Sequence, residues 1–260
     1  MNELVEKGTR AIILAEDGEK FQVHADGGAR RVPGLGVVDT GALVGAKFGT
    51  VKSIGNRRFL LMMPSILDTI DTLRRKAQIV MPKDSANILM HCDIGSGKRV
   101  AEAGSGTGAL AVTIANAVLP DGMVYSYDIR REFLELARDN IAAAGLEAVC
   151  EFKTGDVCEP GGIRERGLDA VVLDIPEPWR ALDNAWEALA PCGHLACYSP
   201  TVNQVELTAR SLLEKRFIGV RSMETLQRDM QVVEKGIRPS FEMLGHSGYL
   251  TFARKVLEKF

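Results

Sequence analysis

A glycine-rich loop between a predicted strand and a predicted helix is the feature that most constrains the fold of this chain. The strand is predicted over Arg99–Ala103, and the loop has the sequence Glu102-Ala103-Gly104-Ser105-Gly106-Thr107-Gly108-Ala109-Leu110. Glycine lets the backbone turn sharply and approach a ligand closely, and the first turn of a helix offers free N–H groups. The loop therefore predicts a ligand-binding turn after the first strand of an α/β sheet.

Strands and helices alternate along the chain after residue 84. Further strands are predicted at Met123–Asp128, Val149–Lys153, Asp169–Leu173, His194–Tyr198, Phe217–Thr225 and Tyr249–Arg254. Helices are predicted at Leu110–Val118, Glu132–Ala144, Ala181–Leu189 and Val202–Lys215. This alternation indicates a Rossmann-like, doubly wound α/β fold with a parallel sheet, whose ligands bind beyond the carboxyl ends of the strands.

The first 64 residues follow a different pattern, in which short β-like runs are broken by turns. Arg10–Ala15 and Phe21–His24 flank Asp17-Gly18, a pair that suits the tight turn of a β-hairpin. Further runs at Gly34–Val38 and Arg58–Met63 are separated by glycines. The sequence thus predicts a small β-barrel-like N-terminal domain over residues 1–64 and the α/β domain over residues 65–260.

Composition excludes several classes of protein. The 32 basic and 34 acidic residues give a net charge of -2, which argues against a strongly basic nucleic-acid-binding protein, although a local patch can exist within a neutral total. The five cysteines form no CxxC pair and the four histidines lie far apart, so no metal site is predicted and the thiols are expected to be reduced. Without an apolar signal or 18 consecutive apolar residues, the chain is expected to be cytoplasmic, with no membrane partner.

Two details of the glycine loop favour S-adenosylmethionine over a dinucleotide as the cofactor. Glu102 lies two places before the first glycine, and the glycines run GxGxG. A pyrophosphate gains little from a neighbouring carboxylate, whereas a cationic, sulfonium-bearing amino acid tolerates it. Because Gly104, Gly106 and Ala109 also satisfy the dinucleotide fingerprint, an NAD-dependent oxidoreductase remains an alternative.

Aspartates follow the second, third and fourth predicted strands of the α/β domain. Asp128 ends the second strand, where a carboxylate can accept both ribose hydroxyls of an adenosine ligand. Asp156, followed by Val157, comes after the third strand and can accept from the adenine amino group. Asp174 ends the fourth strand and faces the crevice where the methyl group would lie, and two prolines stiffen the loop after it. That loop differs from the D/N-P-P-aromatic sequence of amino-group methylases, so it predicts another acceptor atom.

These motifs together resemble the tRNA (adenine-N1)-methyltransferases that act on the T-loop, in their archaeal or bacterial single-subunit form. Besides the glycine loop, the resemblance rests on three segments with the sequences QIVMPKD (residues 78–84), DIPEPW (174–179) and SPTVNQV (199–205), and it covers residues 74 to 254. It implies a homotetramer that methylates N1 of adenosine 58 in tRNA with S-adenosylmethionine as the donor. The sequence leaves open whether adenosine 57 is also methylated.

The resemblance also implies roles for individual residues. The loop from Gly104 to Leu110, with Glu102, Asp128, Asp156, Val157 and Asp174, is expected to form the cofactor and target pocket, and Gln78 to lie on a segment that closes over the cofactor. Asp174 is the expected catalytic residue, because a carboxylate that accepts from the exocyclic amino group would hold N1 in line and stabilise the charge that develops on the ring. Asp128 stands where several relatives carry glutamate.

The sequence leaves two further interpretations open. One is another S-adenosylmethionine methyltransferase, acting on a protein or a small molecule, and the other is a non-catalytic tRNA-binding subunit. For tRNA binding, the candidate basic clusters are Arg74-Arg75-Lys76, Arg57-Arg58, Lys215-Arg216, Lys235 and Arg238. A neutral chain can still assemble a basic cleft from several subunits, because only the local potential matters.

Overall fold

The computed structural model of the chain describes residues 3–234 and 236–259. The chain divides into two compact units, Met1–Leu73 and Arg74–Phe260. Within the described residues, no helix is long and apolar enough to cross a membrane.

The first unit is built from short antiparallel strands around a small apolar core. Its four-stranded sheet has the order β2-β1-β6-β5, and β3 and β4 form a separate two-stranded sheet. Phe21 and Phe59 meet edge to face in the core, with their ring centroids 6.5 Å apart. The elements are β1 (Arg10–Ala15), β2 (Lys20–His24), β3 (Ala29–Val32), β4 (Gly36–Asp39), η1 (Thr40–Leu43), β5 (Val51–Ile54), β6 (Arg57–Met62) and α1 (Ile66–Asp71).

The second unit is organised around a seven-stranded sheet of order β12-β15-β11-β10-β7-β8-β9. The strands are β7 (Arg99–Ala103), β8 (Met123–Asp128), β9 (Cys150–Thr154), β10 (Leu168–Leu173), β11 (Leu189–Ser199), β12 (Phe217–Met223) and β15 (Tyr249–Lys255). The first five of these pair in parallel. From β7, the sheet grows on one side through β8 and β9, and then on the other side through β10 and β11. The order of strands therefore reverses between β7 and β10, and open α/β sheets bind their ligands at such a point.

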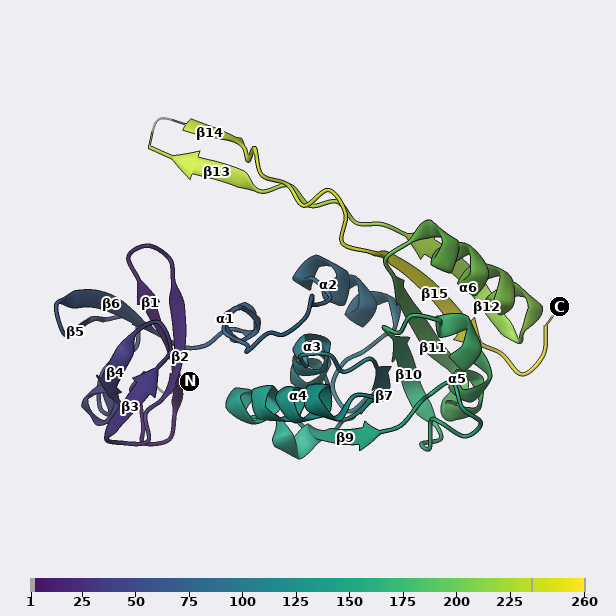
Figure 1. Cartoon of the computed structure of the whole chain (residues 1–260), viewed down its shortest axis with the longest axis horizontal. Helices are drawn as coiled ribbons and strands as arrows, with labels where there is room; N and C mark the ends of the chain where they lie inside the picture. The colour runs from purple at the N-terminus through teal and green to yellow at the C-terminus, as the bar shows by residue number, and fades with distance from the viewer. Residues whose placement is uncertain (1–2, 235, 260) are drawn as a thin grey trace. The chain divides into compact units, whose positions relative to one another are not determined.

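Helices cover both faces of this sheet, with α3 and α4 on one face and α5 and α6 on the other (Figure 1). The helices are α2 (Pro82–His91), α3 (Ala109–Val118), α4 (Arg131–Ala144), α5 (Leu182–Ala188) and α6 (Val202–Glu214), with short 3₁₀ turns η2 (Glu147–Val149) and η3 (Pro178–Ala181). A left-handed Gly145 with φ of 69° ends α4, and a Thr201–Gln204 capping box begins α6. The predicted α/β class is confirmed.

The sheet differs from the expected parallel one at a single strand. β15 runs antiparallel to both of its neighbours, β11 and β12. The described residues between β12 and β15 contain no helix. Two consecutive strands that pair in parallel need a crossover connection between them, which is usually helical, whereas antiparallel strands do not. Without such a helix, β12 and β15 pair as the two sides of a long hairpin.

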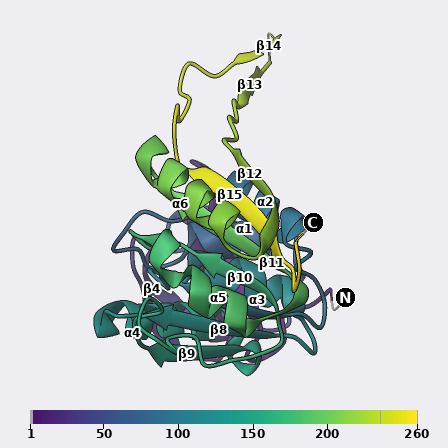
Figure 2. The same cartoon turned by 90° about the vertical axis from the view of Figure 1, so that its right-hand side faces the viewer.

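That segment carries a second, smaller hairpin, which was not predicted. The strands β13 (Met230–Val233) and β14 (Gly236–Pro239) pair antiparallel with each other. Every residue of both strands is exposed. Figures 1 and 2 show the two strands standing off the seven-stranded sheet of their unit.

Candidate functional site

The main pocket lies where β7, β8 and β10 end, at the point of strand reversal. Its volume is about 360 Å³. It is lined by Ala103, Gly104, Tyr127, Asp128, Ile129, Arg130, Gly155, Asp156, Val157, Cys158, Asp174, Ile175, Pro176, Glu177 and Arg180. These residues belong to the ends of four neighbouring strands and the loops that follow them, so the sheet topology alone brings them together.

The glycine loop is held tightly against the neighbouring strand ends. The backbone N–H groups of Gly104 and Ser105 both donate to the Tyr127 carbonyl oxygen, at 2.8 and 3.1 Å. Gly104 has a φ of +93°, and a Cβ atom there would lie 2.0 Å from the Asp174 carbonyl oxygen. Only glycine fits this position, since both the backbone angle and the space exclude a side chain.

Asp128 is 5% exposed and already has several donors. Its Oδ2 accepts from the backbone N–H of Gly106 at 3.2 Å, and its Oδ1 accepts from the backbone N–H of Arg130 at 2.9 Å. The Arg130 guanidinium pairs with the same carboxylate, with Nε 3.2 Å from Oδ1. The carboxylate thus ties the glycine loop to the end of β8 and forms part of the pocket wall.

Asp174 follows β10 and stays partly accessible from the pocket. Its backbone N–H donates to the Ala103 carbonyl oxygen at 2.8 Å, which extends the pairing of β7 with β10 by one residue. Burial of the carboxyl raises the pKa of Asp174 to about 7, and the charge of Asp128 adds to the effect while Arg130 opposes it. A carboxyl with such a pKa changes its protonation state near neutrality.

Glu102, inside β7, is 1% exposed. Ser126 donates to its Oε2 at 2.6 Å, whereas its Oε1 is buried with no hydrogen-bond partner in the described structure. The pKa of Glu102 is raised to about 8, mainly by burial; the Ser126 hydrogen bond lowers it, and the charges of Asp174 and Asp128 contribute to raising it. A buried carboxylate without a full set of partners is costly, and a bound donor or cation would lower that cost.

The electrostatics of the site favour a cationic ligand. The charges of Asp174 and Asp128 disfavour ionisation of Glu102, the charge of Asp128 also disfavours ionisation of Asp174, and Arg130 opposes this effect at Asp174. A ligand with one or more positive charges would stabilise the ionised carboxylates, whereas a pyrophosphate would be repelled. In the described part of the chain, no group of three His, Cys, Asp or Glu residues could hold a metal ion.

Some of the predicted site residues line the pocket in the structure, and others do not. Gly104, Asp128, Asp156, Val157 and Asp174 line the pocket. Five predicted residues of the glycine loop are buried and do not line it, namely Ser105, Thr107, Gly108, Ala109 and Leu110. Gly106 contributes its N–H to Asp128, and Gln78 is an exposed residue of the segment before α2.

Several pocket residues were not predicted. Tyr127, which is 1% exposed, donates its hydroxyl hydrogen bond to the Glu165 carboxylate and lines the pocket. Ile129 and Arg130 directly follow Asp128, and Arg180 ends the loop after Asp174. Their position in the sequence could have identified them, because each of these residues is next to, or a few places after, an aspartate at a strand end.

The predicted basic clusters are largely engaged in local contacts. Arg74 pairs with Asp139 at 3.2 Å, and Lys215 pairs with Asp183 at 2.5 Å. Arg238 lies over the ring of Phe241, and Lys235 lies outside the described residues. Cations at the pocket mouth are Arg130 and Arg180, whose side chains are 50% and 52% exposed.

The sequence matches a family model and two characterised proteins. The model, described as tRNA methyltransferase complex GCD14 subunit, matches residues 58–238. The tRNA (adenine(57)-N(1)/adenine(58)-N(1))-methyltransferase TrmI of Methanocaldococcus jannaschii is 33% identical over 277 residues, which cover 96% of this chain and 93% of that protein. The tRNA (adenine(58)-N(1))-methyltransferase TrmI of Thermus thermophilus is 29% identical over 249 residues, covering 96% and 94%.

Among the solved structures that resemble this chain over nearly its whole length are two methyltransferases. One is named SAM-dependent O-methyltransferase, from Thermotoga maritima, with a TM-score of 0.86, 33% identity, and coverage of 99% of this chain and 97% of that one. The other is tRNA (m1A58) methyltransferase TrmI from Aquifex aeolicus, with a TM-score of 0.77, 25% identity, and coverage of 98% and 100%.

Proposed function

The chain belongs to the tRNA (adenine-N1)-methyltransferase family, and we propose that it transfers a methyl group from S-adenosylmethionine to N1 of adenosine 58 in tRNA. The observation that carries this proposal is the Asp174 carboxylate, which faces the pocket at the end of β10 beside the glycine loop. Because the Methanocaldococcus relative is named for adenosines 57 and 58, adenosine 57 is the second acceptor to test. With tRNA as the substrate, we expect the reaction to take place in the cytoplasm.

The residues of the pocket fit the charge and shape of S-adenosylmethionine. Bound there, this cofactor supplies a methyl group on a cationic sulfur. Glu102, Asp128 and Asp174 form an acidic cluster that suits a cation, and Glu102 has a buried oxygen without a partner in the described structure. Gly104 leaves room for close approach of the ligand, while Asp128, Asp156 and Val157 are assigned to the adenosine portion. Gln78 is assigned to the segment that covers the cofactor.

Asp174 is assigned the catalytic role. Adenine N1 carries an in-plane lone pair, so no base is needed to deprotonate it, and the ring becomes positive as the new bond forms. An ionised Asp174 would accept a hydrogen bond from the exocyclic amino group of the adenine. This bond would hold N1 in line for attack on the methyl carbon and stabilise the positive charge that develops on the ring. Since N1 is engaged in the folded T-loop, the nucleoside must be extruded to reach the pocket.

Recognition of tRNA is assigned to local positive surface and to self-association. Arg130 and Arg180 lie at the pocket and are about half exposed. The β13–β14 hairpin exposes Met230, Val232, Val233 and Ile237, and such an apolar edge suits contact with a second copy of the chain, in line with the proposed homotetramer. Affinity for tRNA that stays constant between low and moderate salt would contradict a phosphate-led interface.

One incubation tests the proposed function directly. The chain is mixed with methyl-labelled S-adenosylmethionine and unmodified tRNA transcript, and the digested nucleosides are separated. We expect the label in 1-methyladenosine, and a matched transcript with uridine at position 58 shows whether position 57 is also methylated. No label in tRNA, or label in a different nucleoside, would overturn the proposal.

A second candidate is methyl transfer to an oxygen atom, which is favoured by the name of the Thermotoga structure. An O-methyltransferase would leave adenine N1 unmodified, so the same nucleoside analysis separates the two candidates. A non-catalytic tRNA-binding subunit would bind the transcript without transferring label.

A further inference from the structure

A polar cluster outside the cofactor pocket, centred on the buried Asp84, fastens the connection between β12 and β15. We call residues 224–248 the arm, and its tip is the β13–β14 hairpin, in which every residue is exposed. Because the tip packs so little, the position of the arm must be set at its base. We call the base residues Glu224, Thr225, His246 and Ser247 the neck.

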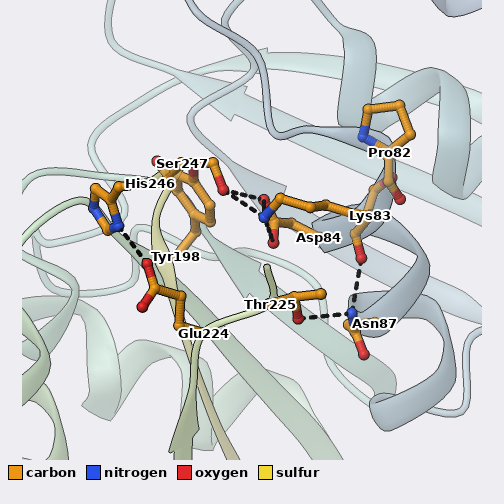
Figure 3. A network of polar contacts seen from close by, with 10 residues as sticks. Pro82, Lys83, Asp84, Asn87, Tyr198, Glu224, Thr225, His246 and Ser247 are labelled. Atoms are coloured by element: carbon orange, nitrogen blue, oxygen red, sulfur yellow. Dashed lines mark hydrogen bonds and ion pairs between the residues drawn. The ribbon is translucent and has the colours of Figure 1, made fainter. Parts of the chain in front are cut away.

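Both sides of the neck are bound to neighbouring elements, as Figure 3 shows. His246 links the two sides, with its Nδ1 2.7 Å from Glu224 Oε1 and its Nε2 2.8 Å from the Pro200 carbonyl oxygen. Asn87, from α2, donates to Thr225 Oγ1 at 3.2 Å. The neck thus touches α2 on one side and the end of β11 on the other.

Ser247 closes a ring of three polar side chains with α2. Lys83 Nζ donates to Asp84 Oδ1 at 2.8 Å and to Ser247 Oγ at 2.7 Å, and Ser247 Oγ donates to Asp84 Oδ2 at 2.7 Å. Asp84 is 0% exposed, and the Lys83 side chain is 10% exposed. A buried ion pair adds little net stability, because desolvation offsets the attraction, but it fixes its partners in position.

This ring is linked through Tyr198 to the strand end that neighbours Asp174. The Tyr198 hydroxyl donates to the Ser247 carbonyl oxygen. A Cβ atom on Gly248 would lie 2.3 Å from Tyr198 Cζ, so the tyrosine ring rests directly on the backbone that leaves the neck. Leu173 on β10 pairs in register with Cys197 on β11, so Asp174 and Tyr198 are the next residues on adjacent parallel strands.

We propose that Asp84, through Lys83 and Ser247, is a positioning residue for methyl transfer to tRNA: it holds the neck and Tyr198 beside Asp174 and thereby sets how the target nucleoside enters the pocket. The proposal rests on the proposed function. None of these residues lines the cofactor pocket, so their effect falls on the acceptor and leaves cofactor binding unchanged.

The test uses two variants of the full chain that disrupt the ring, Ser247→Ala and Asp84→Asn. Two controls accompany them: Ser247→Thr keeps the hydroxyl, and Glu206→Gln breaks an exposed ion pair on α6. Loss of the Ser247 hydroxyl is expected to lower kcat for tRNA by about 10- to 100-fold, as for a misplaced substrate. The dissociation constant for S-adenosylmethionine should stay within twofold of the wild type in every variant. Ser247→Thr should retain most of kcat, and Glu206→Gln all of it.

Hydrogen exchange in residues 224–248 is measured on the same variants, without tRNA. Exchange there should be faster in Ser247→Ala and Asp84→Asn, and unchanged in the Glu206 control. Wild-type kcat in Ser247→Ala, or cofactor affinity that falls in parallel with kcat, would overturn the positioning role, and Ser247→Ala keeps the test valid if Asp84→Asn fails to fold. If the wild-type chain itself leaves tRNA unmethylated, the proposed function fails. If hydrogen exchange in the arm is unchanged in Ser247→Ala and Asp84→Asn, the idea that the ring holds the arm in place is overturned separately.

Discussion

Two carboxyl groups of the pocket are poised to change charge near neutrality, and they differ in their access to a ligand. Asp174 is partly accessible and has a pKa of about 7, whereas Glu102 is almost fully buried and has a pKa of about 8. Burial is the main cause in both cases. Because a bound cation favours the ionised form of each group, cofactor binding should release protons between pH 6 and pH 8.

Substitution of Asp174 by alanine should separate binding from catalysis. We expect kcat to fall about 100- to 1000-fold through loss of transition-state stabilisation, while binding of S-adenosylmethionine, measured by calorimetry, is retained. In the wild type, kcat/KM should rise with pH and level off above about pH 7, because the ionised Asp174 is the stronger acceptor and carries the charge that stabilises the developing positive ring. Near wild-type turnover in the variant would remove Asp174 from the catalytic role.

Glu102 should make the cofactor-free protein less stable as the pH rises. The pKa is about 8 in the folded state against an ordinary value of 4.5, so unfolding releases a proton between these pH values and the free energy of unfolding falls across that window. The full loss is on the order of 5 kcal/mol. Glu102→Gln should be more stable than the wild type at pH 9 and similar at pH 4.5.

Urea unfolding at the two pH values, without cofactor, measures this difference. Asp174→Asn serves as the matched variant, because the pKa of Asp174 is also raised by burial and its replacement should likewise recover part of the stability lost with pH. Equal pH dependence in Glu102→Gln and in the wild type would show that Glu102 keeps its ordinary pKa.

At the scale of elements, the sequence predicted the parts of the site whose signal is local. The glycine loop and Asp128 and Asp174 could be identified because each directly follows an apolar strand. The helix α2 was missed, since no side chain caps its first residue and Pro82 at its first turn was the main signal. The hairpin β13–β14 was missed because it is exposed on both faces and shows no alternation of apolar and polar residues.

The tight fit of the glycine loop predicts unequal costs for two similar substitutions. Gly104 and Gly97 both have positive φ, but a Cβ atom on Gly104 would meet the Asp174 carbonyl oxygen at 2.0 Å, whereas one on Gly97 has nothing within 4 Å. Gly97→Ala should cost about 1 kcal/mol of backbone strain, and Gly104→Ala about 3 kcal/mol or more. Thermal unfolding measures both, and equal shifts in Tm would contradict the close contact.

At the scale of the whole molecule, a net charge of -2 hides a strongly uneven distribution. The average combines an acidic pocket with arginines at its mouth, so composition alone could not predict a tRNA substrate. Tyr127 and Arg180 could not be assigned to one site from the sequence either, because only the order of strands in the sheet brings them together.

Removal of the arm tip tests whether it mediates self-association. Residues 230–239 can be replaced by Asn-Gly, since the N–H of Ser240 donates to the Asp229 carbonyl oxygen at 2.8 Å and already brings the cut ends together. We expect light scattering to report a smaller assembly than for the wild type, because the exposed apolar residues of the hairpin are lost. Affinity for S-adenosylmethionine should persist, since residues 230–234 and 236–239 do not line the pocket.

A matched double variant separates the side chains of the hairpin from its backbone. Val232 and Ile237 are cross-strand partners and are 74% and 66% exposed, so Val232→Ser with Ile237→Ser keeps the hairpin while removing its apolar surface. If side-chain burial drives assembly, this variant should dissociate like the deletion. If backbone pairing between copies drives it, only the deletion should dissociate, and an unchanged mass in both would exclude the hairpin as the contact.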